Sequence, residues 1–169
     1  MSLLESANDY TGRLTFIEHI QAGDDMSRLK RNESITHIMT KELQTINTQT
    51  RLSEVGQIFA ESRFHHLPVV SGSKLVGIVS FVDLMRVNFA DSFGVEANQS
   101  VYDVLDRTLD VESIMTKDPT TLNAKSNVRD AAAILVDSSF HALPIVDDEG
   151  DLLGMVTSAD LLNYMLEQY

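Results

Sequence analysis

The alternation of apolar and polar positions along this chain predicts short strands, tight turns and amphipathic helices. The clearest stretch runs from 140 to 162, where two apolar runs flank turn residues at 147–151. This order is typical of a β-hairpin, and a helix is expected to follow it from 158 to about 167.

The segment from 64 to 84 has the same pattern. It predicts strands at 66–70 and 75–80, a turn at 71–73 and a helix from 81 to about 90.

A short strand and an amphipathic helix are expected before each hairpin. In the first half, Ser34 is expected to cap a short helix, residues 44–47 to form a strand, and Thr50 to cap a helix from 51. In the second half, a helix is expected from Asn127. The apolar residues of the two longer helices recur at helical spacing: Leu52, Val55, Ile58 and Phe59 in the first, and Val128, Ala131, Ala132 and Leu135 in the second.

These similarities indicate an internal duplication. The segment Ile38-Met39-Thr40-Lys41 recurs as Ile114-Met115-Thr116-Lys117, and the hairpin segments align with one residue added in the later turn. Two copies favour a pseudo-symmetric pair, each copy β-α-β-β-α with a small sheet covered by helices, in an α/β (α+β) fold. The predicted boundaries are 1–34 for an N-terminal helical extension, 35–90 for the first repeat, 91–110 for a connector in which Ser100 caps a short helix, and 111–169 for the second repeat.

Composition narrows the function. A net charge of −12 in 169 residues argues against non-specific nucleic-acid binding, which requires a cationic face. The chain has no cysteine, which excludes disulfides, cysteine nucleophiles and cysteine-based zinc sites, and no metal site is expected. The N-terminus lacks the pattern of a signal peptide, and the longest purely apolar run, 131–136, is too short to span a bilayer. We therefore expect a cytoplasmic protein without a membrane segment.

The candidate chemistry lies where the second hairpin strand meets the closing helix. Ser80 is followed three positions later by Asp83, and Thr157 by Asp160. The spacing is that of a capping box, in which each side chain satisfies a free backbone N–H. A helix N-terminus with a hydroxyl also attracts phosphate, and an ionised Asp can accept both hydroxyls of a ribose. We favour the binding role, because capping requires neither an Asp specifically nor a preceding glycine in both copies.

Those glycines, Gly77 and Gly154, lie inside predicted strands. A strand glycine marks either a close approach of backbone or ligand, or a β-bulge, and the sequence leaves both interpretations open.

Taken together, the duplicated IMT segment, the FH-LP segment, the strand glycine and the hydroxyl–acid pair resemble the CBS domain, which occurs as tandem pairs called Bateman modules. The resemblance implies a disc-like pair that binds an adenosine-containing ligand between its repeats, such as AMP, ADP, ATP, NAD, S-adenosylmethionine or a cyclic dinucleotide. It implies that Ser80 and Thr157 contact phosphate and that Asp83 and Asp160 contact ribose. It also implies apolar walls for the adenine, made by Ile46, Leu67, Pro68 and Val79 in the first repeat and by Leu122, Leu143, Pro144 and Val156 in the second. Ordinary core packing is the alternative, and it applies more to the valines than to the Leu-Pro pairs.

Three further residues are candidates for the site. His65 and His141 occupy equivalent positions, where a phosphate contact is secondary to a packing role, and Arg86 lies one helical turn after Asp83. Residues 35–86 contain five Lys or Arg against four Asp or Glu, whereas residues 111–169 contain three against ten. The cleft near Ser80 is therefore expected to prefer a multiply charged phosphate.

No motif for catalysis is present, so we expect a regulatory module rather than an enzyme. The sequence shows no effector domain, so its output is expected to pass to a protein partner or through oligomerisation. We expect a homodimer through the two closing helices, whose excess apolar residues are Leu84, Met85, Leu161, Leu162, Met165 and Leu166. The alternative function is a ligand-free dimerisation or protein-interaction module, in which both hydroxyl–acid pairs only cap helices.

Overall fold

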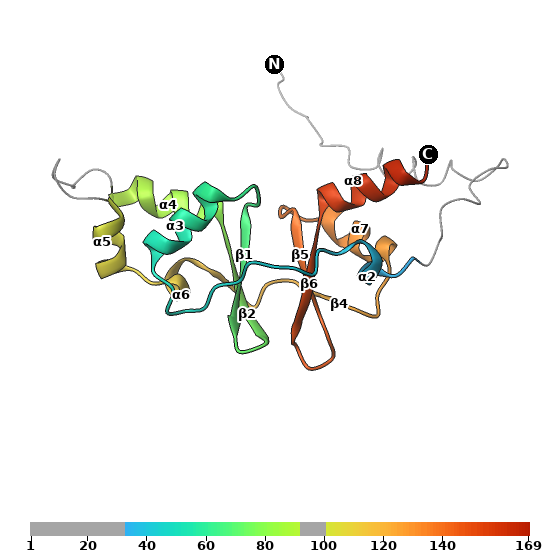
Figure 1. Cartoon of the computed structure of the whole chain (residues 1–169), viewed down its shortest axis with the longest axis horizontal. Coiled ribbons are helices and arrows are strands. Elements are labelled where there is room, and N and C mark those ends of the chain that lie inside the picture. The colour runs from blue at the N-terminus through green and yellow to red at the C-terminus, as the bar shows by residue number, and fades with distance from the viewer. Residues whose placement is uncertain (1–32, 92–100) are drawn as a thin grey trace, which may run out of the picture. The chain divides into compact units, whose positions relative to one another are not determined.

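The computed structural model describes residues 33–91 and 101–169 (Figure 1). The helices expected before residue 33 and the cap expected from Ser100 lie outside these residues. The described part contains two three-stranded sheets and several helices, so the predicted α/β fold is confirmed.

The first repeat is built on the hairpin of β1 (His66–Ser71) and β2 (Lys74–Ser80), which pair antiparallel. Gly72 in the turn has a φ of 65°, a conformation that side chains disfavour. The helix α3 (Leu52–Glu61) contributes Leu52, Val55 and Phe59 to the core, as its spacing predicts. The helix α4 (Phe81–Asp91) follows β2 directly.

The second repeat follows the same order. A short strand β4 (Leu122–Asn123) lies parallel to β5 (Ala142–Val146), and β5 pairs antiparallel with β6 (Leu152–Thr157). The helices are α7 (Val128–Val136) and α8 (Ser158–Glu167). Asn127 caps α7 as predicted, in a capping box with Asp130.

Two expectations for the first repeat are wrong in detail. Thr50 does not cap α3, because its hydroxyl accepts from the Asn47 N–H at 3.1 Å. The start of α3 is satisfied instead by Asp106 of α5 (Val101–Thr108), which accepts from the Ser53 N–H at 2.9 Å. The strand expected at 44–47 is reduced to one bridge, between Ile46 and Val69.

The two repeats exchange their first helices. The helix α2 (Ile35–Ile38), capped by Ser34 as predicted, packs against α7, α8 and β6 of the second repeat, and its Ile35 is fully buried there (Figure 1). The helix α6 (Val111–Ile114) packs against α4 and β2 of the first repeat, where Val111 is fully buried. Each hydrophobic core is therefore completed by a helix that belongs, in sequence, to the other repeat.

The segments after the exchanged helices extend this arrangement. Thr116 and Lys117 form the edge strand β3 (Thr116–Lys117) beside β2. Thr40 pairs with Met155 through two backbone hydrogen bonds, both 2.9 Å long. Each sheet thus carries backbone from the opposite repeat at one edge.

This exchange accounts for the two strand glycines. A Cβ on Gly154 would lie 2.8 Å from the Thr40 carbonyl oxygen, and one on Gly77 would lie 3.1 Å from the Thr116 carbonyl oxygen. Both glycines also face the irregularity in strand pairing that follows Val69 and Ile145. The close approach of the exchanged backbone requires glycine, and the bulge is an additional feature of the same position.

Candidate functional site

Both hydroxyl–acid pairs form capping boxes. The Ser80 hydroxyl donates to Asp83 Oδ2 at 2.6 Å and accepts from the Asp83 N–H at 3.1 Å. The Thr157 hydroxyl donates to Asp160 Oδ2 at 2.7 Å and accepts from the Asp160 N–H at 3.3 Å. The capping role that the sequence suggested is therefore present in both repeats.

Capping occupies only part of each carboxylate. In each pair the hydroxyl donates to the Oδ2 atom of the carboxylate. The Ser80 N–H donates to Asp83 Oδ2 as well, at 2.9 Å. The other oxygen of Asp83, Oδ1, lies 3.5 Å from Arg86 Nη1, and the Arg86 side chain is largely exposed. Capping and ligand binding are thus compatible, because Oδ1 can still accept a hydrogen bond from a bound molecule.

A cleft of about 760 Å³, cleft 1, opens at the start of α4 and is lined from both repeats. Ser80, Asp83 and Arg86 form one side of it. Thr116 of β3 and the loop after it, with Asp118, Pro119 and Thr120, form a second side. The approach to β5, with Ser139, Phe140 and His141, forms a third.

A smaller cleft of about 380 Å³, cleft 2, opens at the start of α8 and is the counterpart of cleft 1. Thr157 and Asp160 lie on one side, Thr40 takes the place that Thr116 has in cleft 1, and Arg63 and Phe64 lie on the approach to β1. The duplication in the sequence therefore produces two related clefts, each built across the repeat boundary.

The structure brings the predicted polar residues to these clefts but excludes most of the predicted apolar walls. Ser80, Asp83, Arg86 and Pro144 line cleft 1, Thr157 and Asp160 line cleft 2, and His65 and His141 line both. The following residues are buried in the cores and line neither cleft: Ile46, Leu67, Pro68, Val79, Leu122, Leu143 and Val156. Burial of these seven side chains is what the alternative of ordinary core packing expects, and their contact with a base stays a prediction.

Apart from Pro144, the apolar surface of cleft 1 comes from residues that the sequence analysis did not select. Ile78, Phe81, Phe140 and Pro119 line the cleft. Ile78 and the buried Val79 are neighbours in β2 and point to opposite faces of the sheet. The two-residue period of the strand therefore predicts that only one of them faces the cleft. Pro119 follows Asp118, whose φ of 46° is unusual for a residue other than glycine.

A third histidine, His66, lines both clefts and has no histidine counterpart, since Ala142 takes its place in the second repeat. Burial lowers the pKa of His66, and His65 and His141 lower it too, against an opposing effect of the Asp83 carboxylate. Because its pKa lies below the ordinary value of 6.5, the His66 side chain is neutral at physiological pH.

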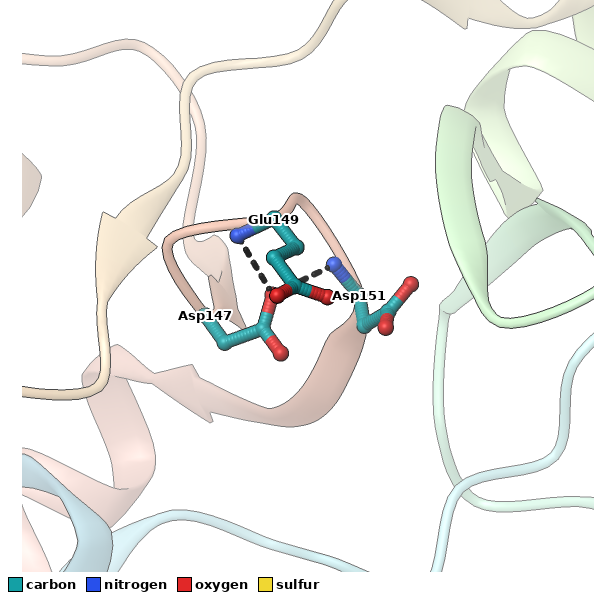
Figure 2. Close-up of side chains that lie close together, drawn as sticks. All are labelled: Asp147, Glu149 and Asp151. Carbon is teal, nitrogen blue, oxygen red and sulfur yellow. Dashed lines mark hydrogen bonds between the residues drawn. The ribbon is translucent and has the colours of Figure 1, made fainter.

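The acidic turn between β5 and β6 has a structural role (Figure 2). The Asp147 carboxylate accepts from the N–H groups of Glu149 and Asp151, at 2.9 and 2.8 Å. Asp151 in turn accepts from the Ser73 hydroxyl at 2.8 Å and lies 2.9 Å from Lys74 Nζ, which joins this turn to the β1–β2 turn. Lys74 lowers the pKa of Asp151, and Asp151 raises the pKa of Lys74.

Comparison with known proteins identifies the fold. A family model described as CBS domain matches residues 35–89 and, a second time, residues 111–167. The chain belongs to the CBS domain family. The two matches confirm the tandem CBS pair that the duplicated motifs predicted.

Relatives with this pair occur in distant organisms. A CBS domain-containing protein of Dictyostelium discoideum is 34% identical over 134 residues, which cover 79% of this chain and 91% of that protein. Protein MJ1225 of Methanocaldococcus jannaschii is 28% identical over 140 residues, covering 82% of this chain. The chain spans 44% to 64% of the lengths of MJ1225 and two other curated relatives.

Among solved structures, CBSX2 of Arabidopsis thaliana in complex with AMP is similar to this CBS pair with a TM-score of 0.66 and 26% identity. The similarity covers 80% of this chain and 97% of CBSX2. Within residues 33–91 and 101–169, no helix combines the length and the hydropathy of a membrane span.

Proposed function

We propose that this CBS pair is a non-catalytic regulatory module that binds an adenosine-containing ligand, of the AMP, ADP or ATP type, in the clefts between its repeats. The observation that carries the proposal is the pair of clefts across the repeat boundary, each with a hydroxyl–acid pair at the start of a helix.

Cleft 1 offers a partner for each part of a nucleotide. The N-terminus of α4 attracts a phosphate, the Ser80 hydroxyl can donate to it in place of Asp83 Oδ2, and Arg86 provides a positive charge nearby. Asp83 Oδ1 can accept from the ribose hydroxyls. Ile78, Phe140 and Pro144 provide apolar surface for a base. A volume of about 760 Å³ lies in the range of small-molecule sites.

A relative supports the class of ligand. CBSX2, whose chain is almost completely covered by the similarity, was crystallised with AMP. We extend adenosine binding to this chain on that basis, because both of its repeats retain the hydroxyl–acid pair.

The order of preference between the clefts rests on their size. Charge does not separate them as the sequence counts suggested, since cleft 1 is lined by Arg86 with Asp83 and Asp118, and cleft 2 by Arg63 with Asp160. The larger volume of cleft 1 favours it for a nucleotide with several phosphates.

A thermal-shift screen against the six ligand types named above tests the proposal. A ligand at about a hundred times its Kd adds roughly 2.7 kcal/mol, which raises Tm by about 5 to 11 °C in a protein of this size. We expect a shift of this size from one ligand, reduced in Asp83→Ala or in Asp160→Ala.

Asp130→Ala is the matched control for both variants. Asp130 completes the capping box of α7 by accepting from the Asn127 N–H at 3.0 Å, but it lines neither cleft. It should lower the stability of the free protein by a comparable amount, about 1 kcal/mol, and leave the ligand-induced shift unchanged.

The observed capping boxes also support the second candidate, a ligand-free interaction module. In that case Asp83→Ala, Asp160→Ala and Asp130→Ala would lower stability alike, and none of the six ligands would raise Tm. That result would overturn the nucleotide proposal.

We also propose that the chain forms a homodimer through α8. Leu162 and Leu166 are 61% and 72% exposed, and Met165 beside them is 48% exposed. The corresponding expectation is wrong for Leu84, which is fully buried, and Met85 and Leu161 are partly buried against the cores of the chain itself. Sedimentation equilibrium should show a dimer that dissociates in Leu162→Glu, whereas Leu153→Glu on β6 should remain a dimer. A monomeric wild type at micromolar concentration would contradict the proposal.

A further inference from the structure

The two clefts share one wall. Three side chains line both of them, His65, His66 and His141, and the two sets of lining residues have no other member in common. His66 is the first residue of β1, and His65 and His141 are the residues directly before β1 and β5.

This wall lies beside the N-termini of α4 and α8, where the proposed function places a phosphate. The His65 carbonyl accepts from the N–H of Phe81, the first residue of α4, at 2.9 Å. The His141 carbonyl accepts from the N–H of Ser158, the first residue of α8, at 3.1 Å. Because an anion binds at the N-terminus of a helix, a phosphate in either cleft lies beside the histidines.

We propose that the two clefts compete for His65, His66 and His141, so that a phosphate-bearing ligand in one cleft lowers the affinity of the other for a second such ligand. This inference rests on the proposed function and adds a rule for how the two sites are filled.

Competition follows from the donor capacity of imidazole. An imidazole N–H can point toward only one phosphate at a time. A first phosphate that takes the shared donors leaves the second with fewer. The same side chains border both clefts, so two bound phosphates also repel each other across them, and this repulsion acts in the same direction.

The other charged side chains do not relieve this competition. Arg86 lines only cleft 1 and already lies 3.5 Å from Asp83 Oδ1. Arg63 lines only cleft 2. Asp83 and Asp118 in cleft 1, and Asp160 in cleft 2, repel a phosphate in the cleft that each one lines.

The test is an amide NMR titration with AMP, in which Val82 reports cleft 1 and Ala159 reports cleft 2. Cleft 2 is titrated in the wild type and in Asp83→Ala, which weakens cleft 1. Cleft 1 is titrated in the wild type and in Asp160→Ala, which weakens cleft 2. We expect the cleft that fills second to bind AMP at least fivefold more tightly when the other is disabled, within the usual range of coupling between sites. Because coupling is reciprocal, both comparisons must give the same factor.

Two variants and one ligand connect the effect to the histidines. In His66→Ala, which reproduces the residue at the equivalent position of the second repeat, and in His141→Ala, which changes an exposed side chain, the coupling factor should fall toward one. In His37→Ala, which removes an exposed histidine that lines neither cleft, it should not change. Adenosine, which has no phosphate, should show no coupling.

The outcomes separate this inference from the function on which it rests. AMP binding to both clefts with a coupling factor of one, or with positive coupling, would overturn the competition and leave nucleotide binding intact. Equal coupling for adenosine would overturn the role of the phosphate. No AMP binding to either cleft would overturn both.

Discussion

Replacement of Gly154 by alanine tests the exchange that builds both clefts. The added Cβ would lie 2.7 Å from Met39 Sδ and 2.8 Å from the Thr40 carbonyl oxygen. The methionine can rotate away, but the carbonyl belongs to backbone that is paired with Met155 by two hydrogen bonds of 2.9 Å. The alanine therefore forces the exchanged segment away from β6.

The cost follows from these contacts. Two backbone hydrogen bonds contribute about 1 kcal/mol each, and overpacking against Met39 adds about 1 to 3 kcal/mol. Alanine also lowers the conformational entropy of the unfolded chain, which stabilises the folded state by about 0.4 to 1 kcal/mol. The free energy of unfolding should thus fall by about 2 to 4.6 kcal/mol, which lowers Tm by roughly 4 to 18 °C.

Differential scanning calorimetry of Gly154→Ala and Gly77→Ala measures this effect. Gly77→Ala should cost less, because its nearest backbone atom, the Thr116 carbonyl oxygen, is 3.1 Å from the new Cβ and the closer Met115 Sδ is flexible. A Tm of Gly154→Ala within about 2 °C of the wild type would refute the packing of α2 and Thr40 on the second repeat. A larger loss in Gly77→Ala would refute the reasoning that backbone contact decides the cost.

Three further predictions concern single side chains. Asp106→Ala removes the acceptor for the Ser53 N–H at the start of α3 and should lower the free energy of unfolding by about 1 kcal/mol, measured by urea denaturation, without changing AMP binding. Burial lowers the pKa of folded His66 below its ordinary value of 6.5, so the unfolded chain binds more protons as pH falls through this range. Stability due to His66 is therefore complete above pH 6.5 and is lost as pH falls through the folded pKa, and the Tm of His66→Ala should decrease less than that of the wild type between pH 7.5 and 5.5. Lys74→Ala should leave Tm unchanged at physiological salt, because its ion pair with Asp151 is exposed, and a clear decrease would assign the contact between the turns a larger role.

The sequence predicted the elements whose signals are local. The two hairpins, the stripe Leu52, Val55 and Phe59, and the capping boxes each depend on residues close together in the chain, and the structure has them where they were expected. The repeated motifs also predicted the tandem arrangement, because a duplication can be recognised without information about contacts between distant residues.

The exchange of α2 and α6 could not be predicted in the same way. The apolar character of Ile35 and Val111 indicates that these residues are buried, but it does not say against which repeat. Two similar cores can each accept either helix by pattern alone, so only the three-dimensional packing decides. Gly77 and Gly154 carried part of the signal, since a strand glycine indicates either a close approach or a β-bulge, and the structure has both at these positions.

The walls of the clefts show a second limit. Leu67 and Val79 are apolar residues beside the polar site, and period alone cannot distinguish the core face of a short strand from a face that borders a cleft. The polar residues were easier to place, because Asp83 and Asp160 are fixed by the caps they form.

We propose that Asp83 and Asp160 bind a nucleotide in addition to capping their helices. Isothermal titration calorimetry with AMP tests it most directly, on the wild type, Asp83→Ala, Asp160→Ala and the capping control Asp130→Ala. Loss of a hydrogen bond to a charged group costs about 1.5 to 3 kcal/mol, so AMP affinity at the altered cleft should fall by about 10- to 150-fold in the first two variants and remain unchanged in the control. Wild-type affinity in both cleft variants, or no heat of binding in the wild type, would contradict the account.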